Sequence, residues 1–277
     1  MEATYIPRYA LPLVLTIHSL ILEMTGLPLI SIITVVRNGR ELLGSTIASV
    51  RAQTLSSIEF IVIDGGSEDG TQDVIRENSD AITHWISEPD DGIYDAMNKG
   101  IQLARGEYLW FLNAGDEIYD SETAEKLVLA AEGSDIYYGE TMLVDIHGKQ
   151  LGLRSELGRN KLPVALSWED MARGMVVCHQ SFLVRRSIAP MYNLSHPYTA
   201  DIDWVIKCLK AASRVTNTKM ILSRFLVGGY SKRHHMKAML DRYRVYRDHF
   251  GFLRNMANHA AIVVEFLYRR IRGKPSI

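Results

Sequence analysis

The sequence predicts an α/β fold in which a mostly parallel sheet is flanked by helices. Short apolar, β-branched runs alternate with amphipathic helical patterns, as βαβ units require. The first four of these runs each end in a polar turn that contains glycine. A length of 277 residues and a hydrophobic content of 47% suit one large domain with appendages, or at most two domains.

The predicted strands and helices follow one another from residue 29. The β-branched run 29–36 ends in Arg37-Asn38-Gly39 and predicts a buried strand followed by a turn. After it we expect helices at 41–53, 70–78 and 91–104 and strands at 58–63, 82–86 and 108–112. The turns that follow parallel strands lie at one edge of the sheet, and α/β folds bind ligands at that edge. Turn chemistry alone is the alternative explanation of the Gly and Asp clusters.

Beyond residue 133 the alternation becomes less regular. Here we expect strands at 136–146, 150–154, 175–184 and 221–227 and helices at 201–212, 236–250 and 252–272. The chain therefore divides into an N-terminal extension at 1–28, a main α/β domain at 29–230 and a basic C-terminal helical region at 231–277.

Charge and cysteine content exclude several classes of protein. The net charge of −1 gives no case for a nucleic-acid partner. Cys178 and Cys208 lack metal-ligand spacing, which predicts a reduced, cytoplasmic compartment without disulfides. From residue 232 to the end, eleven Lys or Arg stand against three Asp or Glu. Apolar residues at 262–267 beside Arg269 to Arg272 favour contact with an anionic membrane surface, and packing on the protein or a second subunit is the alternative.

The N-terminal extension does not read as a membrane span. Residues 11–22 are mostly apolar but contain Pro12 and His18, and the stretch is too short to cross a bilayer. We expect a disordered or surface-packed extension, with a membrane anchor as the alternative. Met24, just before the first convincing strand, is a second candidate for the start of the natural product.

Two acidic loops carry most of the functional information. One lies within residues 88–100, and the other is Asn113-Ala114-Gly115-Asp116. Carboxylates cannot hold an anionic diphosphate directly, so a divalent cation, Mg²⁺ or Mn²⁺, must lie between them. Asp116 is the first candidate ligand and Asn113 its neutral neighbour, while a helix cap is the alternative role for Asp116.

These residues resemble a known family. Segments 31–38, 64–71 and 91–100 are similar to the ordered motifs of family 2 glycosyltransferases, which have the GT-A fold. Segment 88–100 and the Leu-Asn-x-Gly-Asp pattern resemble the colanic-acid-type subgroup in particular. The resemblance covers about residues 29–230. It implies an inverting transfer of one sugar from a nucleotide-sugar donor to a glycan or lipid-linked acceptor in surface polysaccharide biosynthesis. The sequence contains neither a series of membrane-spanning segments nor a Gln-x-x-Arg-Trp pattern. We therefore expect a non-processive enzyme.

The resemblance also assigns roles on the donor side. It places the strand end at Val35 to Arg37 and the turn at Asp64 against the nucleobase and ribose, and Asp91 beside the nucleotide. Residues 113–116 occupy the position of the Asp-x-Asp metal motif, with Asn113 against the nucleotide. Because Asn113 and Gly115 replace acidic residues there, Asp116 alone keeps the metal role. Met97 stands where many relatives have arginine.

On the acceptor side the resemblance places the catalytic base at Asp201. A carboxylate there would remove the proton of the acceptor hydroxyl, with Asp203 as the second choice. A helix N-cap is the alternative role for Asp201. His179 and Gln180 resemble a pair near the acceptor, and a buried core histidine is the alternative.

We expect residues 228–231 to form a flexible lid over the nucleotide, with Lys232, Arg233 and His234 available to the phosphates. A basic solvated loop is the alternative for this segment.

The function predicted from the sequence is therefore a cytoplasmic glycosyltransferase, located peripherally at the inner face of the plasma membrane. Two rivals are a sugar-nucleotide-binding pseudoenzyme, suggested by the depleted metal motif, and a nucleotidyltransferase, which would normally show a basic, glycine-rich signature early in the chain. A dehydrogenase is disfavoured because no Gly-x-Gly-x-x-Gly pattern follows the first strand.

Overall fold

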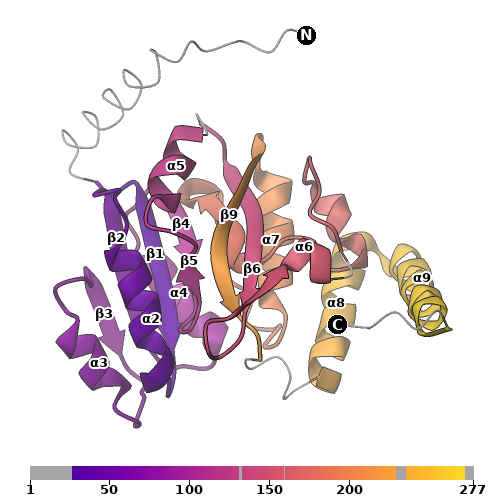
Figure 1. The fold of residues 1–277 in the computed structure, drawn as a ribbon. Coiled ribbons are helices and arrows are strands. Elements are labelled where there is room, and N and C mark those ends of the chain that lie inside the picture. Colours follow the sequence, from indigo (N-terminus) through magenta and orange to yellow (C-terminus); the bar gives the residue numbers. More distant parts are fainter. Residues whose placement is uncertain (1–26, 131–132, 159, 229–234, 272–277) are drawn as a thin grey trace, which may run out of the picture.

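The computed structural model describes residues 27–130, 133–158, 160–228 and 235–271, and the side chains of the last helix as far as residue 261. The predicted N-terminal extension up to residue 26, residues 229–231 of the predicted lid and the basic residues 232–234 after it lie outside the described residues. Within them, nine strands form one sheet in the order β3-β2-β1-β4-β8-β6-β9-β5, with β7 paired to β6. Figure 1 shows helices on both faces of this sheet, which confirms the predicted α/β fold.

The first half of the sheet is parallel, as the alternating pattern predicts. Its strands are β1 (Ile30–Val36), β2 (Ile58–Asp64), β3 (His84–Ser87) and β4 (Tyr108–Phe111). The intervening helices are α2 (Arg40–Arg51), α3 (Thr71–Glu77) and α4 (Ile93–Leu103). Gly100 lets α4 approach β1 closely, because a Cβ at that position would lie 2.4 Å from Cγ2 of Ile33. This approach holds the first turn of α4 beside the edge at which the strands end.

The second half of the sheet mixes directions. Its elements are β5 (Glu117–Ile118), α5 (Thr123–Ala130), β6 (Ile136–Val144), β7 (Gln150–Leu153), α6 (Arg154–Leu157), β8 (Phe182–Arg185), α7 (Ala200–Ala211) and β9 (Val215–Leu226). Strand β8 is antiparallel to both β4 and β6, whereas β6 and β9 run parallel. The sequence pattern does not predict the short elements β5 and α5.

The strand predicted at 175–184 is wrong over most of its length. Only β8 at its end pairs in the sheet, and the 3-10 helix η2 (His179–Ser181) precedes it. Val176 and Val177 are buried within the core cluster without pairing in the sheet, so their apolar character reflects packing. A short apolar run does not by itself distinguish these two environments.

The hydrophobic core consists of two clusters, one on each face of the sheet, and the residues of β1 contribute to both. Ile33 and Val35 belong to one buried cluster, whereas Ile30, Ile32 and Val36 belong to the other. Side chains of successive strand residues point to opposite faces, so a strand that is apolar throughout needs cover on both.

Two C-terminal helices, α8 (His235–Phe250) and α9 (Phe252–Ile271), pack beside α7 and the 3-10 helix η1 (Trp168–Arg173), as Figure 1 shows. Val245 and Tyr246 of α8 are buried in the core cluster that covers one face of the sheet. Helix α8 is therefore part of the domain core. No helix in the described part of the chain is long and apolar enough to span a bilayer.

We predict that Gly106→Ala destabilises the fold by about 2 kcal/mol, because overpacking a tight site costs roughly 1–3 kcal/mol. A Cβ at Gly106 would lie 2.5 Å from the amide nitrogen of Ser31 in the neighbouring strand. The matched control is Gly44→Ala inside α2, where no atom lies within 4 Å. We expect it to stabilise the protein by about 0.5–1 kcal/mol. Urea unfolding of both variants measures the difference, and equal effects would contradict the prediction.

Candidate active site

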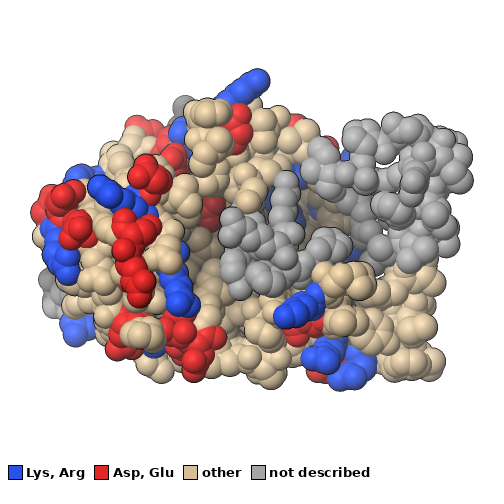
Figure 2. Space-filling view, turned by 90° about the horizontal axis from the view of Figure 1, so that it is seen from below, with Lys and Arg blue, Asp and Glu red and all other residues tan. Residues whose placement is uncertain are grey.

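The candidate site lies at the edge where the parallel strands end. Asp64 is the last residue of β2, and Asp116 follows β4 after a short turn. Figure 2 looks at this edge and shows Asp and Glu side chains, with Lys and Arg among them, gathered on the side of β1 to β3. The edge thus combines ligand-accessible turns with an uneven charge distribution.

The turns after β1 and β2 form one hydrogen-bonded unit. The amide of Asn38 donates to Oγ of Ser67 at 2.7 Å, and the amide of Glu68 donates back to Oδ1 of Asn38 at 3.0 Å. Asn38 has a φ of 50°, a left-handed conformation that asparagine tolerates better than most residues. Beside this turn, Val35 is buried and Arg37 is exposed, so Arg37 presents a cation at the strand end.

Asp64 organises the second turn from within. Its carboxylate is fully buried and accepts hydrogen bonds from the amide and the hydroxyl of Ser67. It also accepts one from the hydroxyl of Ser87, at 2.6 Å, at the end of β3. The sequence predicts contact between Asp64 and the nucleotide, and the structure shows this buried carboxylate at the end of β2, joined by hydrogen bonds to its own turn and to the end of β3.

The acidic loop before α4 is held in place by one lysine. Nζ of Lys99 lies 2.8 Å from Oε1 of Glu88 and 3.5 Å from Oδ2 of Asp95, and it donates to the carbonyl of Pro89. Asp91 remains exposed at the tip of this loop, where its amide donates to Oδ2 of Asp95 at 3.2 Å. The predicted position of Asp91 beside a bound nucleotide is therefore accessible.

This acidic loop also abuts the turn after β2. A Cβ at Gly65 would lie 2.1 Å from Oδ2 of Asp90, so the Asp90 carboxylate packs directly against the backbone of this turn. The three turns on the donor side are consequently packed against one another.

Asp116 is buried, with 4% of its surface exposed. Oδ1 accepts a hydrogen bond from the amide of Leu226 at 3.2 Å, and Oδ2 accepts one from Nε2 of Gln180 at 2.9 Å. Burial raises the pKa of this carboxyl to about 7, although these hydrogen bonds oppose the shift. A cation beside Asp116 would stabilise its ionised form.

Asn113 supplies a second oxygen at this turn. Its Oδ1 is buried and has no hydrogen-bond partner, and its carbonyl accepts the amide of Asp116 at 2.9 Å. Among the described residues, no three His, Cys, Asp or Glu side chains are grouped as a metal site. One carboxylate and one unpartnered amide oxygen nevertheless fit Mg²⁺ or Mn²⁺, which usually take further ligands from substrate phosphates and water.

His179 and Gln180 lie below the surface rather than on an open acceptor face. Their exposed fractions are 6% and 5%. Nε2 of His179 shares a hydrogen bond of 2.6 Å with the hydroxyl of Tyr192, and Gln180 donates to Asp116 as described above. Both side chains therefore contact other buried residues of the site, Tyr192 and Asp116 among them.

Asp201 and Asp203 occupy different environments at the start of α7. Asp201 is partly exposed, and its Oδ1 accepts a hydrogen bond from the hydroxyl of Tyr94 at 3.0 Å. Burial raises the pKa of Asp201, and the Tyr94 hydrogen bond offsets this only in part. Burial also opposes ionisation of Asp203, but hydrogen bonds from His249 and Lys207 lower its pKa below the usual range.

Asp203 faces α8 rather than Tyr94. Its two oxygens lie 2.8 Å from Nε2 of His249 and 2.7 Å from Nζ of Lys207. These two contacts engage both oxygens of the Asp203 carboxylate. Of the two residues, only Asp201 therefore combines partial exposure with a raised pKa. When the pKa values of two neighbouring carboxyl groups shift in opposite directions, the two groups suit different roles, one chemical and one structural.

Tyr94 is the residue of the candidate site that the sequence analysis did not single out, although it lies inside segment 91–100. Its ring stacks on that of Tyr192, with centroids 5.5 Å apart, and Tyr192 stacks on Trp204 of α7 at 5.0 Å. Asn98 holds Tyr192 through its backbone carbonyl and amide, at 3.0 and 2.7 Å. Tyr94 therefore connects the start of α4, just after Asp91, with the carboxylate of Asp201.

A match to a family model identifies the protein family of this chain. The model described as "Glycosyl transferase family 2" matches residues 31–189, more than half of the chain. The chain belongs to glycosyl transferase family 2. The match covers the donor-side turns together with Asn113 and Asp116, whereas Asp201 and the C-terminal helices of this family 2 chain lie outside it.

Relatives of known name agree with the family. An uncharacterised glycosyltransferase of Mycobacterium tuberculosis is 31% identical over 240 residues, which cover 85% of each chain. A glycosyltransferase of PGL/p-HBAD biosynthesis from Mycobacterium bovis is 30% identical over 199 residues, covering 68% of this family 2 chain and 73% of the relative.

Solved structures confirm the GT-A fold. S. aureus TarS matches with a TM-score of 0.61 and 14% identity, over 78% of this family 2 chain and 38% of TarS. TarS 1-349 in complex with UDP matches with a TM-score of 0.57 and 14% identity, over 78% and 63% of the two chains. A mannosyltransferase from Pyrobaculum calidifontis, in complex with GDP-Man and Mn²⁺, gives a TM-score of 0.54 and 14% identity over 86% and 76%.

The burial of His179 generates a stability prediction for the family 2 chain. Burial lowers its pKa from 6.5 to about 4. On acidification the unfolded state takes up a proton on His179 that the folded state does not. The contribution of this side chain to the free energy of unfolding therefore decreases as the pH falls below 6.5. We expect the advantage of wild type over His179→Gln in unfolding free energy to shrink by about 2 kcal/mol from pH 7 to pH 5.

Urea unfolding at both pH values measures this difference. The raised pKa of Asp116 produces the opposite slope, but it is present in both proteins and cancels in the comparison. The control is His84→Gln, because the His84 side chain is 40% exposed. Stability curves for wild type and His179→Gln that stay parallel between the two pH values would show the prediction to be wrong.

Proposed function

We propose that this protein is an inverting, non-processive glycosyltransferase of surface polysaccharide biosynthesis, acting on a glycan or lipid-linked acceptor. The resemblance to the colanic-acid-type subgroup suggests this pathway class, and a hexose is the sugar that we expect it to transfer. The single observation that carries the proposal is the Asp201 carboxylate. It is partly exposed, has a raised pKa and accepts a hydrogen bond from Tyr94, which extends from the donor-side loop.

Asp201 acts as the general base of the proposed reaction. Its carboxylate takes the proton of the acceptor hydroxyl while the hydroxyl oxygen forms a bond to the anomeric carbon of the donor. The bond between that carbon and the diphosphate lies on the opposite face and breaks at the same time. The nucleoside diphosphate leaves with the electron pair of that bond, and the configuration at the anomeric carbon inverts. A raised pKa suits this role, because the base must hold the proton once it is transferred. The Tyr94 hydroxyl orients the carboxylate.

The donor side of the proposal is a nucleoside-diphosphate sugar. Arg37 and Asp91 are exposed at the strand-end edge, Val35 is buried near the end of β1, and Asp64 holds the turn that would line the nucleotide. TarS binds UDP, and the Pyrobaculum enzyme binds GDP-Man. Because these neighbours share the fold, a donor of the same chemical class is the natural expectation for this chain.

A divalent cation, Mn²⁺ or Mg²⁺, belongs to the proposal. Oδ1 of Asn113 and the carboxylate of Asp116 are the protein groups that would hold it. When bound, the cation supplies positive charge that stabilises the leaving diphosphate. The Mn²⁺ in the Pyrobaculum enzyme supports this assignment.

We also propose a cytoplasmic location, peripheral to an anionic membrane at the inner face of the plasma membrane. Helices α8 and α9 expose large apolar side chains, namely Met236, Met239, Leu240, Phe252, Leu253 and Met256. Lys237, Arg244 and Arg254 lie on the same two helices. Apolar side chains beside cations favour shallow contact with anionic lipid. The side chains of 262–271, which suggest the same contact from sequence, lie outside the described residues.

A binding module without turnover is the second candidate function. It is favoured by the donor-side metal turn, where Gly115 and Asn113 leave one carboxylate that is buried and hydrogen-bonded on both oxygens. Family membership removes the sequence-level case for a nucleotidyltransferase.

Transfer assays separate these functions. We expect wild type to turn over one member of a panel of UDP-, GDP- and TDP-sugars with Mn²⁺ and a lipid-linked acceptor. Asp201→Asn should lower kcat by about 10²–10⁴, the usual contribution of a general base. The control Asp248→Asn changes an exposed α8 carboxylate paired with Arg247 and should match wild type.

The donor should raise the Tm of wild type and Asp201→Asn alike, because binding stabilises the native state. Asp116→Asn should abolish the additional Mn²⁺-dependent rise. Wild-type kcat retained by Asp201→Asn would eliminate this base. A donor that raises the Tm of wild type but is never turned over would establish the binding module instead.

Flotation with lipid vesicles tests the membrane contact. We expect wild type to bind vesicles that contain anionic phosphatidylglycerol, more weakly at high salt, and not phosphatidylcholine alone. Leu253→Asp should weaken binding, whereas Val164→Asp should not, since both side chains are more than 80% exposed but only Leu253 lies on the C-terminal helices. Equal binding by the two variants would contradict the proposal.

A further inference from the structure

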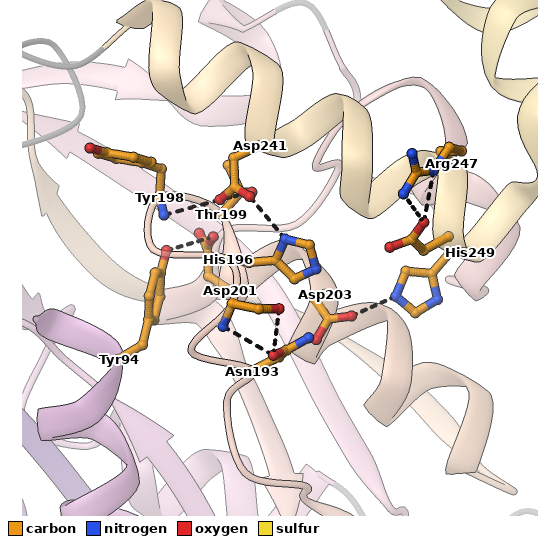
Figure 3. Close-up of polar contacts among 12 residues, drawn as sticks. Tyr94, Asn193, His196, Tyr198, Thr199, Asp201, Asp203, Asp241, Arg247 and His249 are labelled. Carbon is orange, nitrogen blue, oxygen red and sulfur yellow. Dashed lines mark hydrogen bonds and ion pairs between the residues drawn. The ribbon is translucent and has the colours of Figure 1, made fainter. Parts of the chain in front are cut away.

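A buried carboxylate of α8 reaches the segment that leads into α7. Asp241 is 3% exposed, and its partners lie outside its own helix. Oδ1 accepts a hydrogen bond from Nδ1 of His196 at 2.9 Å. Oδ2 accepts one from the amide of Tyr198 at 3.1 Å and another from the hydroxyl of Thr199 at 2.9 Å. Figure 3 shows Asp241 projecting from α8 toward these residues, with Asp201 and Tyr94 beside them.

These hydrogen bonds determine how α7 begins. Thr199 is the N-cap residue of α7, yet its side chain makes no cap hydrogen bond within the helix. Its hydroxyl donates to Asp241 instead, while its carbonyl accepts the amide of Ile202 at 3.1 Å. The backbone of the first turn is therefore oriented by α8, only two residues before Asp201.

A buried carboxylate with three donors makes this contact strong and specific. Removing one partner of a buried charged hydrogen-bond network leaves the other groups without solvent or protein partners, which is costly. Because the donors include a backbone amide and a cap hydroxyl, the contact restrains the direction of the chain as well as holding α8 in place. A small rotation at Thr199 would move the carboxylate of Asp201 relative to the Tyr94 hydroxyl.

We propose that Asp241 is a positioning residue for Asp201, so that α8 completes the active site. This inference rests on the proposed function, in which Asp201 is the base. Asp201 is then oriented from two sides, by the Tyr94 hydroxyl of α4 and by the start of α7 that Asp241 holds. The family model ends at residue 189, so α8 contributes to catalysis from outside the matched region.

A second contact between α7 and α8 provides a matched control. His249 lies about two turns beyond Asp241 along α8. Its Nε2 is 2.8 Å from Oδ1 of Asp203, so it contacts a side chain in the first turn of α7 and not the segment that leads into the helix. If Asp241 only docks α8 on α7, His249→Leu and Asp241→Asn should affect activity alike. If Asp241 positions the base, the two variants should lower Tm alike and differ in kcat.

The experiment is a double-mutant cycle measured by transfer kinetics. We expect Asp241→Asn to lower kcat by about 10–100-fold, the scale of effect that misplacing a catalytic group by about 1 Å produces, with the donor KM unchanged. In an Asp201→Asn background the same change should cost less than about threefold, since a residue that acts through Asp201 has nothing left to position. Thr199→Val, which removes the hydroxyl and keeps the side-chain shape, should reproduce part of the loss.

The outcomes separate this inference from the proposed function. A loss of kcat no larger than that of His249→Leu, or a loss that multiplies fully with Asp201→Asn, would overturn the role of Asp241. Should Asp241→Asn fail to fold, the cycle is measured with Thr199→Val by the same criteria. Absence of transfer by wild type would instead refute the proposed function, whereas an active wild type that Asp201→Asn leaves unchanged would refute the base.

Discussion

The stacked rings of Tyr94, Tyr192 and Trp204 are the contact on which the candidate site depends. Tyr94 lies in the first turn of α4 and Trp204 lies in α7, and both belong to the same core cluster on one face of the sheet. Tyr192 lies between them, stacked on both and hydrogen-bonded to His179. Aromatic rings bury a large apolar area in a defined geometry, so this stack sets the separation of the two helices. The Tyr94 hydroxyl can meet Asp201 only because the stack holds α4 and α7 at this distance.

The same stack explains why the donor-side motif matters beyond its carboxylates. Asn98 binds the backbone of Tyr192, and Lys99 binds the loop that carries Asp91. One short helix therefore fixes the acidic loop at its start and the aromatic contact along its length. The helix can lie so close to β1 because Gly100 faces Ile33. The residues of segment 91–100 thus act together, each through a different contact.

Much of the fold could be predicted from local pattern, and much of the site could not. The run that forms β1 is β-branched and closed by Asn38 and Gly39, so its state and its end are both encoded locally. The apolar residues before β8 are buried in a core cluster that distant parts of the chain build, which no local periodicity reveals. The distinction between Asp201 and Asp203 depends on His249, 46 residues further along the chain from Asp203. Sequence reasoning named both carboxylates but had no means of seeing which one faces Tyr94.

The buried carboxylates differ in how completely the protein satisfies them, and this difference separates their roles. Asp64 and Asp241 each accept several hydrogen bonds from groups of the same domain, and Asp203 contacts two cationic or potentially cationic side chains. The oxygens of such carboxylates are already occupied by protein donors and have little capacity left for a ligand. Asp116 and Asp201 accept fewer hydrogen bonds than Asp64 and Asp241, and burial raises the pKa of each. A group left in this condition gains most from an incoming cation or proton, and these two carboxylates are therefore where chemistry is best placed.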